Sequence, residues 1–158
     1  MLFRSNLLIF GSTGEGKTHL AISLGRAACQ NGFKVAFLSV NQFFEESSAQ
    51  KAAGKQRNWL LKLKKHDIII FDDFALRNYT HEEANVLLDI LEDRYRKSVH
   101  IFTTQVDIPG WSAVFEDKVI YEAIVDRIIN PSEKLVLKGG SYREKFNRMH
   151  PPPLTKQN

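Results

Sequence analysis

The feature that most constrains how this chain folds is a glycine-rich loop near its start. Residues 11–18 read Gly-Ser-Thr-Gly-Glu-Gly-Lys-Thr, which fits the pattern G-x-x-x-x-G-K-[ST]. An apolar run at 7–10 predicts a buried strand before the loop, and residues 17–31 predict a helix that ends near Gly32. Strand, loop and helix in this order are the context in which the pattern holds phosphate groups. The sequence therefore predicts a phosphate-binding site early in the fold.

The loop provides a set of candidate nucleotide-binding residues. Its glycines allow consecutive backbone N–H groups to turn toward phosphate oxygens, and the helix N-terminus adds a favourable dipole. Lys17 is expected to reach the β- and γ-phosphates of ATP, and Thr18 to bind Mg²⁺. The full set is Gly11, Ser12, Thr13, Gly14, Glu15, Gly16, Lys17, Thr18 and His19. A glycine-rich turn that fits by chance is the alternative, and the flanking strand and helix argue against it.

Two adjacent carboxylates follow a second apolar run. Residues 68–71 are Ile-Ile-Ile-Phe, and Asp72 and Asp73 come directly after them. Behind a phosphate-binding loop, Asp72 is expected to hold Mg²⁺ together with Thr18. Asp73 is expected to orient the water that attacks the γ-phosphate. An ordinary acidic turn is the alternative.

The rest of the chain alternates between strand-like and helix-like segments. Strands are predicted at 34–40, 67–71, 99–104 and 134–138, and helices at 41–53, 58–65, 80–97 and 118–129. Thr80, with Glu83 three residues later, predicts a capping box. Apolar strands alternating with helices form a parallel sheet covered on both faces, and ligands bind at the carboxyl ends of its strands. The expected class is α/β: a P-loop NTPase with a parallel five-stranded sheet and helices on both faces.

Phosphoryl transfer also requires positive charge and polar groups around the γ-phosphate. Three further residues are candidates for this role. Gln105 closes the polar tip of the predicted strand 99–104, Arg127 lies near the end of a helix, and Arg143 follows the last strand. For each arginine a surface ion pair is the alternative, and spacing alone favours it.

Composition restricts the class of protein. The chain has 158 residues, of which 43% are hydrophobic and 25% charged, as in a single ordinary globular domain. The longest apolar runs are a few residues, whereas a membrane span needs about 20. The single cysteine, Cys29, is expected to be a small buried side chain, and the histidines show no metal-ligand spacing. These features predict a soluble protein of a reducing compartment, with no membrane partner and no zinc.

The positive charge is concentrated in one segment. The net charge is +4, and residues 51–65 contain six basic and no acidic residues. Lys51, Lys55 and Arg57 flank the flexible Gly54 and are the candidate contacts to DNA phosphates, which give sequence-independent affinity. The alternative is a solvated helix face whose leucines, Leu60, Leu61 and Leu63, pack inward.

Taken in order, these motifs resemble the ATPase domain of the IstB/DnaC group, which belongs to the AAA+ ATPases of ASCE type. The resemblance runs from residue 7 to about residue 145. Its carriers are Gly-Ser-Thr-Gly-Glu-Gly-Lys-Thr-His-Leu-Ala (11–21), Phe-Asp-Asp-Phe (71–74), Leu-Glu-Asp-Arg-Tyr (91–95), Thr-Thr-Gln (103–105), Ala-Ile-Val-Asp-Arg-Ile (123–128) and Gly-Gly-Ser-Tyr-Arg (139–143). Gln105 and the sequence through Trp111 are more similar to IstB than to the helicase loaders.

The resemblance implies roles for the polar candidates and for partners. Gln105 matches the sensor-1 position, Arg127 the arginine finger that reaches a neighbouring subunit, and Arg143 the sensor-2 arginine. It implies ATP-dependent self-association on DNA, ATP hydrolysis, assistance to a transposase, and a bacterial cytoplasmic location. The alternatives are a replicative helicase loader of the DnaC type and an ATP-switched DNA-binding scaffold with little turnover. A small-molecule P-loop kinase is a third, for which no arginine-dense lid segment is found.

Two departures from the family pattern bear on the domain organisation. Asp73 stands where most AAA+ proteins have glutamate, although this group uses aspartate there. We also expect the family's N-terminal segment to be absent, because the sequence begins almost at the first predicted strand. We therefore expect an AAA+ core over 1–148 and a disordered tail over 149–158. Arg94 and Arg96 are expected either to line a subunit interface or to pair with acidic neighbours on their helix, and Trp111 to lie in the core.

Overall fold

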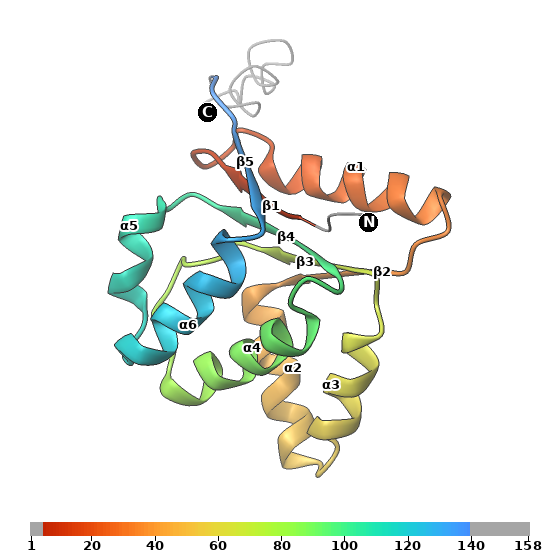
Figure 1. Ribbon diagram of the computed structural model, residues 1–158, viewed down its shortest axis with the longest axis vertical. Helices are drawn as coiled ribbons and strands as arrows, with labels where there is room; N and C mark the ends of the chain where they lie inside the picture. The colour runs from red at the N-terminus through yellow and green to blue at the C-terminus, as the bar shows by residue number, and fades with distance from the viewer. Residues whose placement is uncertain (1–4, 140–158) are drawn as a thin grey trace, which may run out of the picture.

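The computed structural model describes residues 5–139, which form one α/β unit (Figure 1). The predictions for Arg143 and for a tail over 149–158 lie outside the described residues. The elements in order are β1 (Asn6–Phe10), α1 (Lys17–Gln30), β2 (Val35–Ser39), α2 (Val40–Ala52), α3 (Gln56–Lys64), β3 (Ile68–Asp72), α4 (His81–Arg94), β4 (Val99–Thr104), α5 (Ile108–Trp111), the 3-10 helix η1 (Ser112–Val114), α6 (Lys118–Ile129) and β5 (Ser132–Val136).

The strands form the predicted parallel five-stranded sheet, and their order in it is β2-β3-β4-β1-β5. Every connection between neighbouring strands is therefore a crossover, which brings the carboxyl ends of all five strands to one edge. β1, β3 and β4 lie at the centre of the sheet, so the loops that follow them meet at this edge.

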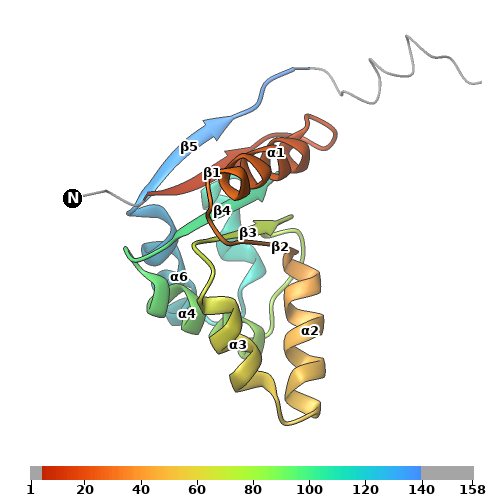
Figure 2. The same ribbon diagram turned by 90° about the vertical axis from the view of Figure 1, so that its right-hand side faces the viewer.

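Helices cover both faces of the sheet, but unequally. Figure 2 shows α1 alone on one face and α2, α3, α4 and α6 on the other. Alternation along each strand divides the core accordingly. Ile9, Ile70 and Ile101 point toward α1, whereas Leu8, Ile69 and Phe102 join the larger cluster under the other helices.

Aromatic side chains fill the larger side of the core. The Phe71 and Phe102 rings stack with their centroids 5.3 Å apart, and Phe74 meets the Trp111 ring edge-on at 4.8 Å. Trp111 is fully buried, as predicted, and its indole N–H donates to the Val106 carbonyl. This packing fixes the segments that follow β3 and β4, because Phe74 and Trp111 belong to those segments.

Several local predictions are confirmed and others are wrong. The predicted capping box at Thr80 is present, and Ser39 forms a second one with Gln42. Cys29 is exposed, because it lies on the side of α1 away from the sheet. Leu61 is exposed while Leu60 and Leu63 are buried, since adjacent residues of a helix cannot share one face.

The short helices α5 and η1 were not predicted, because Pro109 and Gly110 make the sequence resemble a loop. Predicted boundaries elsewhere differ by a few residues at most. No helix within residues 5–139 is both long and apolar enough to cross a membrane.

Candidate nucleotide-binding site

The glycine-rich loop lies between β1 and α1, at the carboxyl edge of the sheet. Gly14 and Gly16 have φ angles of 84° and 87°, a region that residues with a side chain rarely adopt. Lys17 is the first residue of α1 and is buried, and its Nζ donates to the Ser12 carbonyl at 2.9 Å. The Glu15 carboxylate folds back and accepts from the Ser12 backbone N–H. The local sequence therefore forms the predicted phosphate-binding loop.

Thr18 and Asp72 meet at this edge, although 54 residues separate them. The Thr18 hydroxyl donates to the Asp72 carboxylate, with Oγ1 to Oδ1 and Oδ2 distances of 2.9 and 3.0 Å. Thr103, at the end of β4, donates to Asp72 Oδ1 from the other side. Asp72 is buried and rests between two hydroxyl groups, so its orientation is fixed.

Asp73 follows in a left-handed conformation with a φ of 58°. Its backbone N–H donates to Thr103 Oγ1 at 3.0 Å, so the same threonine contacts the Asp72 carboxylate and the Asp73 backbone. Partial burial, together with the nearby Asp72 charge, raises the pKa of the Asp73 carboxyl above its usual range. This is the direction that makes a carboxylate a stronger base.

A cavity of about 600 Å³ opens between the loop and Asp73. It is lined by Thr13, Gly14, Gly16, Lys17, Thr18, His19, Ile22, Asp73, Leu76 and Gln105. The Gln105 side chain reaches the loop directly, because its Oε1 accepts from the Thr13 hydroxyl at 2.6 Å. The structure thus brings most of the loop, Asp73 and Gln105 around one cavity, and Gly11, Ser12 and Glu15 are not among its lining residues.

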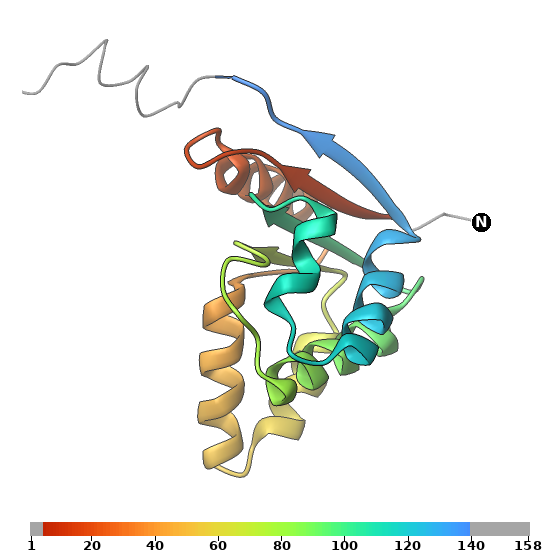
Figure 3. The ribbon, with the colours of Figure 1, turned by 90° about the vertical axis from the view of Figure 1, so that its left-hand side faces the viewer.

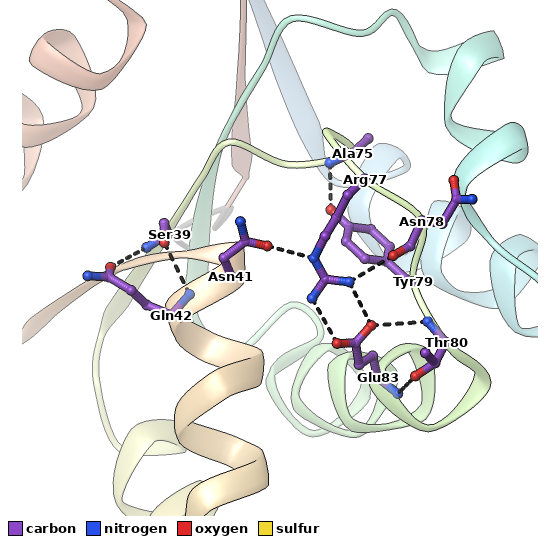
Figure 4. A network of polar contacts seen from close by, with 9 residues as sticks. All are labelled: Ser39, Asn41, Gln42, Ala75, Arg77, Asn78, Tyr79, Thr80 and Glu83. Atoms are coloured by element: carbon purple, nitrogen blue, oxygen red, sulfur yellow. Dashed lines mark hydrogen bonds and ion pairs between the residues drawn. The ribbon is translucent and has the colours of Figure 1, made fainter.

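The loop after Asp73 is held by Arg77, which sequence reasoning did not identify. Figure 4 shows its guanidinium paired with both oxygens of Glu83, while its Nε donates to Asn41 at the start of α2. In the same loop, the Ala75 backbone N–H donates to the Tyr79 hydroxyl at 2.6 Å. Arg77 therefore fastens the loop to both α2 and α4. The predicted capping box was the signal that could have pointed to this contact. Its Glu83 carboxylate accepts from the Thr80 backbone N–H and also from the Arg77 guanidinium.

Arg127 lies at the opposite edge of the sheet. It is in the last turn of α6, and the Asn6 side chain, at the amino end of β1, donates to its backbone carbonyl. Its guanidinium lies over the Tyr95 ring, 4.8 Å from the centroid, and contacts Asp126 at 2.6 Å and Glu92 at 3.8 Å. The structure does not bring Arg127 to the cavity of its own chain.

The three candidate DNA contacts lie at the turn between α2 and α3, the lower tip of the molecule in Figure 3. Lys51, Lys55 and Arg57 are exposed, and Lys51 forms an exposed ion pair with Glu82. Lys64, in the same basic segment, is instead bound by two carboxylates of α4, Asp89 and Asp93. Lys51, Lys55 and Arg57 thus place exposed positive charge at the tip, while Lys62 and Lys65 are exposed toward the other end of α3.

Arg94 differs from both sequence-based expectations. It is buried and neither lines an exposed surface nor pairs with an acidic neighbour. Its five N–H groups are directed to the carbonyls of Lys64, His66, Asp67 and Val99 and to His100 Nε2. Burial lowers its pKa to about 10.

Thr18 and Asp72 provide the donor set that Mg²⁺ prefers in nucleotide sites, one hydroxyl and one carboxylate beside the phosphates. Within residues 5–139, no cluster of three or more His, Cys, Asp or Glu side chains is arranged to bind a metal by itself. A site of this composition leaves the remaining coordination positions for water and phosphate oxygens.

The sheet order, the loop after β1 and the carboxylate pair after β3 define a P-loop ATPase domain of the AAA+ class. The chain belongs to the family described as IstB-like ATP binding protein, which matches residues 3–150. A protein of insertion sequence IS21 from Pseudomonas aeruginosa, named for ATP binding, is 33% identical over 90% of this chain and 54% of its own length. A similarly named protein of insertion sequence IS5376 from Geobacillus stearothermophilus is 30% identical over 92% and 58%.

Solved structures support the fold. The DnaC helicase loader superimposes with a TM-score of 0.72 at 22% identity, covering 85% of this chain and 78% of that one. The replication initiator DnaA bound to AMPPCP and single-stranded DNA gives 0.72 at 19% identity, covering 96% and 47%. The chain spans about half the length of the curated insertion-sequence relatives it matches.

Proposed function

We propose that this chain hydrolyses ATP on behalf of an insertion sequence, as a DNA-associated AAA+ ATPase that assists a transposase. One observation carries the proposal: the buried Asp72 bonds to Thr18 of the phosphate-binding loop, while Asp73 lines the same cavity as Lys17. Phosphate binding, metal binding and water activation thus have groups at one edge of the sheet.

Each residue at this edge has one task in the proposed reaction. Lys17 and the loop N–H groups bind the β- and γ-phosphates. Thr18 and Asp72 hold Mg²⁺, which when bound neutralises charge that develops on the phosphate oxygens. Asp73 accepts a hydrogen bond from the attacking water and draws its proton away. Gln105, already bonded to Thr13, is placed to contact the γ-phosphate or that water.

Arg127 acts on another chain in this proposal. A five-residue strand is about 17 Å long, and Arg127 and the phosphate-binding loop lie beyond opposite ends of β1. An arginine side chain cannot cross that distance, so its charge can only stabilise the reaction at a neighbour's γ-phosphate. Hydrolysis then requires self-association with ATP. Arg143, outside the described residues, is proposed as the sensor-2 arginine of its own chain, within an ATPase core over 1–148.

DNA is the proposed surface on which the chains assemble. The exposed charge of Lys51, Lys55 and Arg57 supports phosphate contacts without sequence preference. The relatives are bacterial proteins named after insertion sequences, which favours a transposase as the partner and the bacterial cytoplasm as the location. The fold shared with the DnaC helicase loader supports the second candidate, delivery of a replicative helicase.

Steady-state ATP hydrolysis tests the proposal, measured at low salt over a range of protein concentrations, with and without duplex DNA. We expect turnover per chain to rise with protein concentration and to rise further with DNA. Turnover per chain that is constant and indifferent to DNA would contradict an assembling, DNA-associated ATPase. Slow turnover that DNA leaves unchanged, with ATP-dependent DNA binding retained, would favour the switched scaffold.

A further inference from the structure

The surroundings of Arg127 suggest that its position is set by other residues. Its guanidinium is partly exposed and faces the Tyr95 ring, at the end of α4, with Glu92 one turn earlier on the same helix. α4 and α6 lie side by side (Figure 1), so the two helices present Tyr95 and Arg127 at one surface. A cation over an aromatic face is attracted by the ring's negative charge distribution, which restricts where the guanidinium rests.

A buried chain of polar groups joins the two helix ends beneath this pair. Arg94, next to Tyr95, donates its Nε–H to His100 Nε2 at 3.0 Å. An arginine can only donate, so Nε2 carries the lone pair and the His100 proton is on Nδ1. That proton faces Asn6 Oδ1 at 3.2 Å, and the Asn6 amide donates to the carbonyls of Arg127 and Ile128.

Each member of this buried chain has its hydrogen bonds satisfied. All five N–H groups of Arg94 have acceptors, and Asn6 Oδ1 also accepts the His100 backbone N–H at 2.9 Å. Burial holds the pKa of His100 at about 3, so the ring stays neutral and keeps one pattern of bonds. Satisfied buried networks of this kind fix one geometry, because any shift leaves a polar group unpaired.

We infer that Tyr95 and Glu92 are positioning residues for Arg127, held in register with it by the chain Arg94–His100–Asn6. This inference rests on the proposed function, in which Arg127 completes the nucleotide site of a neighbouring chain. Tyr95 restricts the guanidinium on one face, while its Nη1 and Nη2 contact Asp126 and Glu92, contacts that the partner's phosphate would replace. The arginine side chain is therefore already restricted before it reaches the phosphate, so less conformational entropy is lost when it binds there.

A two-chain mixture tests this inference. The acceptor carries Arg127→Ala, so it binds ATP and lacks the arginine. The donor carries Lys17→Ala, so its own site is inactive and its Arg127 is intact. ATP turnover of the mixture therefore measures how well the donor's Arg127 acts at the acceptor's nucleotide site. Adding Tyr95→Leu to the donor is expected to lower this turnover about fivefold, with the acceptor's KM for ATP unchanged. Tyr95→Phe in the donor keeps the aromatic face and is expected to retain turnover within about twofold.

The matched control places Tyr95→Leu in the acceptor, where Arg127 is already missing, and turnover is expected to equal that of the reference mixture. Loss on both sides would indicate a general folding defect and overturn the positioning role. Equal or higher turnover with the Tyr95→Leu donor would also overturn it, while the proposed function stands. A reference mixture with no turnover at any ratio would contradict the arginine acting between chains, and the positioning role with it.

Discussion

The two ends of β1 use polar residues in opposite ways. Beyond Phe10, at the carboxyl end, polar side chains and backbone N–H groups surround a cavity of about 600 Å³. At the amino end, Asn6 is buried and bonds to His100 and to the end of α6. One end arranges polar groups around space for a ligand, and the other uses them to fix two helices.

The difference explains why a single chain is an incomplete catalyst in our proposal. A cavity that binds phosphate keeps its donors directed at the ligand, which leaves few groups to hold the surrounding loops. Arg77 performs that holding task from outside the cavity, through Glu83 and Asn41. An arginine that must reach a second chain needs the opposite arrangement: an exposed guanidinium on a backbone that buried hydrogen bonds hold in place. Arg127, over Tyr95, has this arrangement.

The largest effect is expected from Asp73→Asn at the carboxyl end. The amide cannot take the proton of the attacking water, so ATP turnover should fall roughly a thousandfold while ATP affinity stays within a few fold. Because the pKa of Asp73 is raised, the acid limb of the pH–turnover profile should lie above the ordinary aspartate value of 3.8. Asp107→Asn, an exposed aspartate after β4, is the control and should leave turnover unchanged. Equal turnover in Asp73→Asn would show that another group activates the water.

Lys17→Ala should have the next largest effect, on binding. Loss of its charge beside the β- and γ-phosphates is expected to weaken ATP affinity about a hundredfold, or about 2.7 kcal/mol, measured with a fluorescent ATP analogue. Lys62→Ala, an exposed lysine on α3, is the control and should keep the parent affinity. Retained affinity in Lys17→Ala would mean that nucleotide binds elsewhere than in this cavity.

Arg94→Met tests the amino end, where the expected effect is on stability. The substitution leaves several buried carbonyls without a donor, which is offset in part by removing a buried charge, so we expect the free energy of unfolding to fall by about 2 kcal/mol. Urea denaturation measures this change, and Arg96→Met on the exposed neighbour should cost less than about 0.5 kcal/mol. ATP affinity should be unchanged, since the cavity lies at the other end. A parallel loss of affinity would show that the two ends are not independent.

Arg77→Ala is expected to have the smallest effect. The ion pair with Glu83 is partly exposed, so its loss should lower the free energy of unfolding by about 1 kcal/mol at pH 7. Arg77 lowers the pKa of Glu83, so this contribution exists above the ordinary glutamate value of 4.5 and is lost as pH falls through the lower folded-state pKa. The difference between parent and variant should therefore shrink in acid. A difference independent of pH would assign the effect to Asn41 or to packing on Phe44.

The sequence alone determined the carboxyl edge of the sheet. The phosphate-binding loop uses consecutive backbone groups, and the carboxylate pair follows its strand directly, so both can be found from local pattern. The parallel five-stranded sheet also follows from the alternation of apolar strands with helices, whereas the strand order β2-β3-β4-β1-β5 came only from the structure. Gln105 could be proposed because it belongs to the polar tip of the predicted strand 99–104.

Only the tertiary structure decided what holds those groups in place. Asn6 and His100 are 94 residues apart, and the contact between Arg77 and Asn41 joins a loop to the start of α2, 36 residues away. Arg94 occupies a charged-looking helix end, yet the packing of α3 and β4 against it makes it a buried donor to carbonyls. Local sequence patterns show periodicity and charge, whereas the burial of a side chain depends on which segments, distant in sequence, pack against it. For the same reason, the sequence identified Arg127 but did not show that it lies at the far end of β1 from its own nucleotide cavity.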